Sequence, residues 1–269
     1  MQRKILGLLV LLLAGCVLLA GCTGTTPAPN TTTTSSVNQS DLKDSYIIGI
    51  DNAYKPFSYQ EKDGSFNGFD IESSKWIANK LGFKVEHQAV AWDGMIPALQ
   101  AKKIDMVYSG MTILEERKAQ VAFSKPYLKI NQSVAVRDDS TLTFDDIMAG
   151  KAVIGTQRGT SGEAEVQKLI DAGKMPASNL KTFDNFPLAI QALVNKQVDA
   201  TVYDKPSTIE AIAGQPVKII GDIDTNEQYG IAIRKEDTVL LDAMNRGLDL
   251  LMADPYWDEL KAKYNLTET

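Results

Sequence analysis

From residue 46 to the C-terminus, short apolar runs alternate with segments that have the periodicity of amphipathic helices. Residues 46–50 are typical of a buried strand, and residues 70–81 place Ile71, Ile77 and Leu81 on one face of a helix. Alternation of this kind predicts parallel sheets that are covered by helices on both faces. The pattern continues long enough for two sheets, so the sequence predicts an α/β fold with two compact lobes.

The same periodicity gives a full set of predicted elements. The predicted strands are residues 46–50, 83–90, 104–108, 134–137, 152–155, 180–183, 200–203, 217–220 and 230–233. The predicted helices are residues 70–81, 95–101, a helix that opens at 112, and residues 144–148, 163–172, 188–195, 207–213, 239–252 and 257–264. We expect Asp70 to cap the first helix and Gly82 to end it. The run from Thr112 to Glu115 is expected to open the third helix as a capping box.

The N-terminal end has the pattern of an export signal. Arg3 and Lys4 precede an apolar run over residues 5–20, which is short for a bilayer span of about 20 residues. Cys16 and Cys22 each close a Leu-Ala-Gly-Cys string, which resembles the lipobox of secreted lipoproteins, whose cysteine is lipidated. We expect Cys22 to carry the lipid, because polar sequence begins directly after it. The alternative is a signal peptide with incidental small residues.

The segment after Cys22 is expected to be a flexible tether. Residues 23–40 are rich in Thr and Ser, contain Pro27 and Pro29, and carry no charged or aromatic side chain. Such a segment cannot bury enough apolar surface to become ordered. Residues 1–22 are then the signal peptide, and no second apolar run of membrane length follows. The sequence predicts a protein outside the cell membrane, in the periplasm or at the cell surface, anchored to its outer face by an N-terminal lipid.

The composition excludes several classes of function. The net charge of −6 at pH 7 has the wrong sign for a protein that neutralises a phosphate backbone. One histidine and two cysteines leave little material for a zinc site, an iron–sulfur site or Ser-His chemistry. We therefore expect no nucleic-acid partner, no metal and no cofactor.

Eight short motifs follow one another along the chain. They are DNAYKPF at 51–57, GFD at 68–70, WDGMIPAL at 92–99, GMT at 110–112 with Arg117, FSKPY at 123–127, GTQRGTS at 155–161, VDA at 198–200 with Asp204, and YGIA at 229–232. Together they resemble the amino-acid-binding family of extracytoplasmic solute-binding proteins that serve ABC importers, solute-binding protein family 3. The resemblance covers the chain from about residue 46 to the C-terminus.

The resemblance implies the two-lobed type II periplasmic-binding-protein fold. In this fold two α/β lobes are joined by two crossing strands, and a ligand binds in the cleft between them. Lobe 1 would be residues 41–131 and 229–269, and lobe 2 residues 132–228. The resemblance also implies a monomer whose lobes close over the ligand.

A free α-amino acid carries a carboxylate and an ammonium group, so its pocket needs a cation and an anion. Arg117 matches the family motif and is expected to bind the carboxylate bidentately, aided by the N-terminus of the helix that Thr112 opens. Asp204 follows the predicted strand 200–203 and is expected to bind the ammonium. The alternatives are a solvated helix arginine and a helix cap, respectively.

The motifs supply four further contacts to the charged groups of the ligand. The Thr112 hydroxyl and the Gly110 carbonyl are expected to assist at the ammonium. Thr160 and Ser161 begin a predicted helix, so their backbone N–H groups are expected to hold the carboxylate from the second lobe. Because each lobe supplies one set of contacts, the ligand favours the closed state.

Four other residues are expected around the ligand side chain. Tyr54 and Trp92 resemble the family's flanking aromatic positions, with core packing as the alternative. Asp51 and Gln157 resemble positions at the far end of the pocket, where an acidic residue can meet a cationic or amide side chain. The alternative for Asp51 is a strand-end residue that caps local N–H groups.

The sequence thus predicts a non-enzymatic lipoprotein that captures a polar or basic amino acid and delivers it to the permease of an ABC transporter. One alternative is a dehydratase-type enzyme on the same scaffold, for which only Asp51 and Asp204 are available as proton donors. A second alternative is a ligand-sensing subunit of a signalling complex.

Overall fold

The computed structural model describes residues 42–266. The predicted signal peptide, Cys16, Cys22 and the tether lie outside the described residues. Within residues 42–266 no helix has both the length and the apolar character needed to cross a membrane. The same residues contain no group of three or more His, Cys, Asp or Glu side chains that could hold a metal ion.

The first five-stranded sheet is built from two parts of the chain that are far apart in sequence. Its strand order is β5 (Lys84–Ala89), β1 (Ser45–Ile50), β6 (Met106–Val107), β13 (Ala232–Ile233) and β7 (Ala122–Phe123). Strand β1 runs parallel to β5 and to β6, while β13 runs antiparallel to β6 and β7. The α/β class predicted from the periodicity is confirmed.

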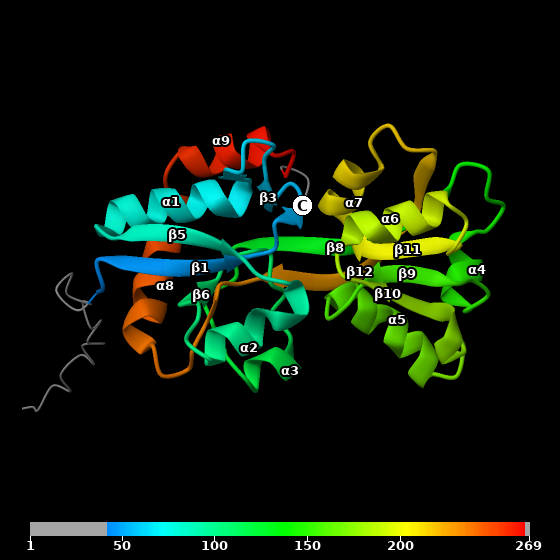
Figure 1. Cartoon of the computed structure of the whole chain (residues 1–269), viewed down its shortest axis with the longest axis horizontal. Coiled ribbons are helices and arrows are strands. Elements are labelled where there is room, and N and C mark those ends of the chain that lie inside the picture. The colour runs from blue at the N-terminus through cyan, green and yellow to red at the C-terminus, as the bar shows by residue number, and fades with distance from the viewer. Residues whose placement is uncertain (1–41, 267–269) are drawn as a thin grey trace, which may run out of the picture. The chain divides into compact units, whose positions relative to one another are not determined.

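The second five-stranded sheet contains the two longest strands. Its order is β10 (Leu180–Phe183), β9 (Ile154–Gln157), β11 (Ala200–Asp204), β8 (Leu128–Arg137) and β12 (Val217–Tyr229). Strands β8 and β12 pair side by side and antiparallel, as Figure 1 shows in green and orange. Strand β8 follows the strands of the first sheet and β12 leads back to β13, so the two must run in opposite directions. The prediction of purely parallel sheets is therefore wrong at β8, β12 and β13.

A small third sheet was not predicted. It consists of β2 (Ala53–Tyr54), β3 (Ser58–Gln60) and β4 (Phe66–Asn67). These strands have only two or three residues each, which is too short for a periodic pattern to be visible in the sequence. Tyr54 ends β2, four residues after the end of β1 at Ile50.

Nine helices occur among the described residues. They are α1 (Phe69–Leu81), α2 (Met95–Gln100), α3 (Glu115–Lys118), α4 (Phe144–Met148), α5 (Ser161–Asp171), α6 (Phe186–Val194), α7 (Lys205–Ile212), α8 (Thr238–Met252) and α9 (Tyr256–Lys263), with short 3₁₀ turns at Trp92–Gly94 and Ala177–Asn179. Figure 1 shows α1 lying along β5. Helix α8 packs against α1 at Gly247, where an added Cβ would lie 2.4 Å from Ile77.

The ends of α1 test two predictions. Gly82 ends the helix in the left-handed conformation, with φ of 79°, as predicted. Asp70 does not cap the helix, because the N-cap position is Gly68 and α1 starts at Phe69. The carboxylate of Asp70 instead points into the protein and accepts a hydrogen bond of 2.7 Å from the backbone N–H of Gly110.

The capping box predicted at Thr112 is also wrong. Helix α3 begins at Glu115, and its N-cap residue Leu114 makes no side-chain cap. Thr112 lies before the helix and forms an isolated bridge with Tyr229. Its hydroxyl is engaged by Glu227 instead of by the backbone of α3. Arg117 consequently lies in the only turn of a four-residue helix. The prediction that the N-terminus of this helix assists in binding a carboxylate is therefore wrong.

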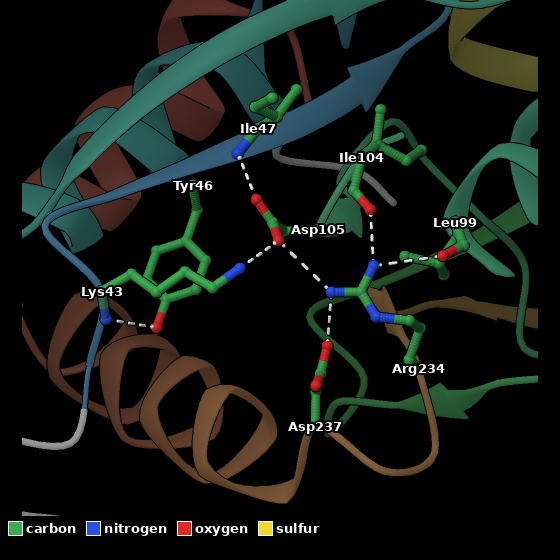
Figure 2. Close-up of polar contacts among 8 residues, drawn as sticks. All are labelled: Lys43, Tyr46, Ile47, Leu99, Ile104, Asp105, Arg234 and Asp237. Carbon is green, nitrogen blue, oxygen red and sulfur yellow. Dashed lines mark hydrogen bonds and ion pairs between the residues drawn. The ribbon is translucent and has the colours of Figure 1, made fainter. Parts of the chain in front are cut away.

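An ionic network around the buried side chain of Arg234 joins the strands of the first sheet (Figure 2). Arg234, directly after β13, donates through Nη1 to the carbonyls of Leu99 and Ile104 at 3.1 and 2.6 Å. Its Nη2 pairs with Asp105 at 3.3 Å and with Asp237 at 2.5 Å. Arg234 therefore ties the returning end of the chain to the segment before β6.

We expect the substitution Arg234→Leu to destabilise the protein by about 3 kcal/mol, because it removes four contacts of a buried cation. The Ile104 carbonyl loses its Arg234 hydrogen bond, and Asp105 keeps, among the described residues, only Lys43 and the Ile47 N–H. Urea unfolding followed by circular dichroism measures the loss. The neighbouring substitution Lys235→Leu removes the same charge from an exposed side chain and should cost less than about 1 kcal/mol. Equal losses in the two variants would show that the network does not stabilise the sheet.

Candidate ligand-binding site

Arg117 is buried, with 6% of the residue exposed. Its Nη1 donates to the carbonyl of Thr112 and its Nη2 to the carbonyl of Gly159, both at 2.9 Å. The guanidinium carbon lies 5.6 Å from the ring centroid of Trp92. Burial lowers the pKa of Arg117, while the nearby charges of Glu116 and Asp204 raise it.

The alternative of a solvated surface arginine is therefore wrong. The hydrogen-bond partners of Arg117 are backbone carbonyls, and no ion pair joins it to any carboxylate within the described part of the chain. A buried cation without a counter-anion is costly. The guanidinium is thus suited to an anion that arrives from outside the chain.

Asp204 occupies the end of β11 and is buried, with 7% exposed. Its Oδ1 accepts a hydrogen bond from Gln132 Nε2, and its Oδ2 accepts one from the hydroxyl of Tyr54. Asp204 stands at the N-cap position of α7 but makes no side-chain cap, so the capping alternative is wrong. Burial and the negative charge of Glu227 raise the pKa of Asp204 to about 6.

Two hydroxyl groups lie close to each other beside these charges. Thr112 Oγ1 and Ser161 Oγ are 3.3 Å apart. Ser161 is the first residue of α5, two residues before the predicted bound of 163, and Thr160 is its N-cap. The Thr160 hydroxyl donates to the carbonyl of Gln157 at 2.7 Å and accepts from the N–H of Glu163 at 3.3 Å. The side chain of Thr160 is thus committed to the helix end, and only its backbone is available for a ligand.

Asp51 and Gln157 lie together, as the sequence analysis expected. Asp51 Oδ2 accepts a hydrogen bond of 2.7 Å from Gln157 Nε2, and Tyr203 donates to Gln157 Oε1 at 2.6 Å. Asp51 Oδ1 also accepts from the N–H of Ala53 at 2.9 Å, so the predicted local capping is present as well. Burial is the main cause of a raised pKa at Asp51.

Tyr54, Trp92 and Gly110 surround the charged groups. The hydroxyl of Tyr54 lies 2.5 Å from that of Tyr229. Trp92 Nε1 donates to the Gly159 carbonyl at 2.9 Å, the same oxygen that Arg117 contacts. Gly110 has φ of +57°, and a Cβ there would lie 2.5 Å from the ring of Tyr54. Only glycine fits between this ring and the backbone.

The buried carboxylate of Asp70 binds the backbone N–H of Gly110. Its Oδ2 accepts from the N–H of Gly110 at 2.7 Å and from the hydroxyl of Tyr127 at 3.0 Å. Burial raises the pKa of Asp70 to about 8, and these two hydrogen bonds oppose the shift. Asp70 thus supports the backbone of a predicted site residue, a role that the sequence analysis did not assign.

Three polar residues near Asp204 were missed by the sequence analysis. They are Gln132 on β8, and Glu227 and Tyr229 on β12. All three are buried. The predicted strands 134–137 and 217–220 stopped short of them, because polar residues interrupt the apolar pattern there. The sequence does contain a signal for a longer strand. In residues 128–137 apolar and polar residues are interspersed along one strand, β8.

The arrangement brings every predicted site residue except Cys22, which lies outside the described residues, into one connected group. Thr112 contacts Ser161, Arg117 contacts Gly159, Tyr54 contacts Asp204, and Asp51 contacts Gln157. The group contains a buried cation without an ion-pair partner among the described residues, and buried carboxylates. This geometry suits a small molecule with both an anionic and a cationic group; the ligand roles of the individual residues stay predictions.

The chain is similar to several proteins that are named for binding amino acids. The chain is 30% identical over 223 residues to a probable histidine-binding protein of Neisseria gonorrhoeae, which covers 81% of this chain and 82% of that protein. It is 36% identical to an ancestral arginine-binding protein bound to arginine, with a TM-score of 0.77 and coverage of 83% and 99%. An ancestral amino acid-binding protein, a precursor of cyclohexadienyl dehydratase, matches at 36% identity and a TM-score of 0.73, with coverage of 82% and 96%.

These relatives are named as binding proteins and not as enzymes, in agreement with the prediction from sequence. The structural matches also confirm the two-lobed α/β fold of periplasmic binding proteins. The family model for bacterial extracellular solute-binding proteins, family 3, matches residues 46–267. The match spans nearly all of the chain that the structure describes, and the chain therefore belongs to the bacterial extracellular solute-binding proteins of family 3.

Proposed function

We propose that the protein captures a free amino acid in this site and delivers it to the permease of an ABC transporter. The observation that carries the proposal is a pair of buried, opposite charges. Arg117 has no carboxylate partner within residues 42–266, and Asp204 is a buried carboxylate of the same group. Arg117 would bind the α-carboxylate together with the backbone N–H groups of Thr160 and Ser161. Asp204 would bind the α-ammonium, with help from Thr112 and the Gly110 carbonyl.

We propose that the ligand is a polar or basic amino acid. Asp51 and Gln157 form a hydrogen-bonded pair that Tyr203 extends. A carboxylate and an amide at this place can receive a cationic or amide side chain. Tyr54 and Trp92 would flank the chain of the ligand with their rings. Relatives are named for histidine and for arginine, which agrees with a side chain that carries nitrogen.

Capture would occur by closure of the two lobes, which we place at residues 41–131 with 229–269 and at residues 132–228. Arg117 and Trp92 of the first lobe both reach the carbonyl of Gly159 in the second. A ligand that contacts Arg117 from one lobe and Ser161 from the other gains all its hydrogen bonds only when the lobes are together. It therefore shifts the equilibrium toward the closed state.

The location of the protein forms part of the proposal. Lipidation of Cys22 and the tether over residues 23–40 would hold a monomer at the outer face of the membrane, near the permease. Mass spectrometry of the membrane-extracted protein tests this point, because an acylated N-terminal peptide must begin at Cys22. A peptide that begins at Cys16 would move the anchor to the other cysteine.

A thermal-shift screen against the common amino acids tests the function. A ligand present at 100 times its dissociation constant stabilises the folded protein by about 2.7 kcal/mol. We expect a shift with one or a few polar or basic amino acids. If none of them produces a shift, amino-acid capture is wrong.

The dehydratase alternative has one observation in its favour, since one structural relative is a precursor of cyclohexadienyl dehydratase. Incubation with prephenate or arogenate tests it, and formation of the aromatic product would overturn the proposal of a binding protein. The sensor alternative is tested by capture of membrane partners, where a signalling protein in place of a permease would support it.

We expect the substitution Asp51→Ala to change the choice of ligand without removing binding. The carboxylate of Asp51 is hydrogen-bonded to Gln157 and makes no hydrogen bond or ion pair with Arg117 or Asp204 in the described part of the chain. Basic ligands should lose about 2 kcal/mol, the value of a hydrogen bond to a charged group, while small neutral ligands should be affected little. Calorimetric titration with arginine and with a small neutral amino acid such as alanine measures the difference. An equal loss for both ligands would contradict a role in specificity.

A further inference from the structure

Glu227 is a buried carboxylate that no part of the proposed function uses. It lies near the end of β12, with 6% of the residue exposed. The register of β12 against β8 shifts between Ile223 and Glu227, which pair with Gln132 and Ile130 respectively. Within this irregular stretch Asn226 has a positive φ of 51°. The irregularity directs Glu227 inward, toward the group that contains Asp204.

Two side chains of this group, Thr112 and Gln132, contact Glu227. Its Oε2 accepts a hydrogen bond of 2.9 Å from Thr112 and lies 3.3 Å from Gln132 Nε2. The same nitrogen donates to Asp204 Oδ1 and lies 3.2 Å from Ser161 Oγ. Glu227 Oε1 is buried and has no hydrogen-bond partner in the described part of the chain.

The hydrogen-bond donors of Gln132 are therefore too few for the acceptors that surround its amide nitrogen. The amide nitrogen of Gln132 carries two protons but faces three acceptors, on Asp204, Glu227 and Ser161. The two carboxylates repel each other, which is one cause of the raised pKa of Asp204. Arg117 is a nearby cation, but it donates to backbone carbonyls and forms an ion pair with neither carboxylate. The two buried anions therefore still lack a directly bound cation. An ammonium group has three donor protons and a positive charge, so it meets both needs.

We propose that Glu227 is a second carboxylate of the ammonium subsite, and that the α-ammonium of the ligand binds between Asp204 and Glu227. This inference rests on the proposed function and deepens it. The ammonium would donate to both carboxylates and would free the Gln132 amide for Ser161. Since β8 and β12 carry Gln132 and Glu227, the ligand would also contact the two strands that join the sheets.

The test is calorimetric titration of the full chain with L-arginine and with desamino-arginine, which keeps the guanidinium and the carboxylate but has hydrogen in place of the ammonium. If the thermal-shift screen gives no shift with L-arginine, L-histidine and its desamino analogue are used instead. The variants are Glu227→Gln, Asp204→Asn and Asp224→Asn. Asp224 is an exposed carboxylate on the same strand and controls for the loss of one charge.

We expect Glu227→Gln to weaken L-arginine about 10- to 100-fold, the effect of losing one hydrogen bond to a charged group. Desamino-arginine should bind this variant as well as the wild type, or better, because one uncompensated anion has been removed. Asp204→Asn should show the same pattern and Asp224→Asn should show neither change. Glu227→Asp, which keeps the charge, should recover part of the affinity for L-arginine.

Three results separate the possible failures. If Glu227→Gln weakens both ligands by the same factor, Glu227 acts on the structure of the site and not on the ammonium, and this inference is overturned. If Asp204→Asn discriminates between the ligands and Glu227→Gln does not, the proposed function stands and only this inference falls. If the wild type binds neither amino acid of the two pairs and no other in the screen, both fall together.

Discussion

Replacing Arg117 with alanine should abolish the thermal shift with every amino acid. The guanidinium is the buried cation of the site, and its ion pair with a ligand carboxylate would be bidentate and desolvated. Removal of one partner from such a pair costs about 3 to 5 kcal/mol, which corresponds to an affinity loss of roughly 100-fold to several thousand-fold. Calorimetric titration with the amino acid that gives the largest shift in the wild type measures this loss.

Two controls are needed for this result. Arg158→Ala removes an arginine of the same neighbourhood that pairs with Asp184 at the surface, and it should leave the affinity within a few-fold of wild type. Arg117→Lys keeps the charge but not the planar fork, so it should bind with intermediate affinity. If Arg117→Ala binds amino acids normally and is folded, the assignment of the carboxylate site is wrong.

Replacing Asp204 with asparagine should weaken amino-acid binding at neutral pH by about 100-fold or more, because the buried anion that pairs with the ammonium is lost. The pH dependence gives a second test. The pKa of Asp204 is raised to about 6, by burial first and by Glu227 second. Below this pH the carboxyl is protonated and neutral, so the affinity of the wild type should fall as the pH is lowered through about 6.

The same titration has the opposite effect on the stability of the ligand-free protein. The folded-state pKa of Asp204 lies above the ordinary value of 3.8, so the folded state binds the proton more tightly than the unfolded state. The contribution of this group to stability is therefore largest at low pH and is lost as the pH rises through about 6. Asp204→Asn should remove both effects. Wild-type affinity that does not change between pH 5 and pH 8 would contradict the pairing of Asp204 with an ammonium.

The sequence motifs allowed residues of the candidate site that are far apart in the chain to be predicted. The pairs Tyr54–Asp204 and Asp51–Gln157 come from distant motifs and meet in the structure. Neither pair could have been derived from periodicity, because hydrogen-bond partners more than 100 residues apart leave no local pattern. The prediction depended on motifs that occur in the order typical of the family.

The parts that were missed share a physical cause. Gln132 and Glu227 are polar residues on long strands, and a periodicity argument treats a polar residue as the end of a buried strand. Here this assumption fails, because these polar groups are buried and hydrogen-bond to one another. The ends of α1 and α3 failed for a related reason. Asp70 and Thr112 have side chains that favour helix caps. In the structure Asp70 instead accepts a hydrogen bond from Gly110, and Thr112 donates one to Glu227.

The order in which the chain supplies the strands of the first sheet has a consequence for how the protein reaches its native state. Val107 of β6 pairs with Ala232 of β13, so the sheet that starts first along the chain is completed by a strand from near the C-terminus. The second sheet, whose strands all lie between Leu128 and Tyr229, also depends on a distant segment, because Leu128 of β8 pairs with Tyr229 of β12. We expect both sheets to close late and slowly, since long-range pairing slows folding. A chain that emerges from its N-terminus onward would thus remain half-assembled until almost all of it is available.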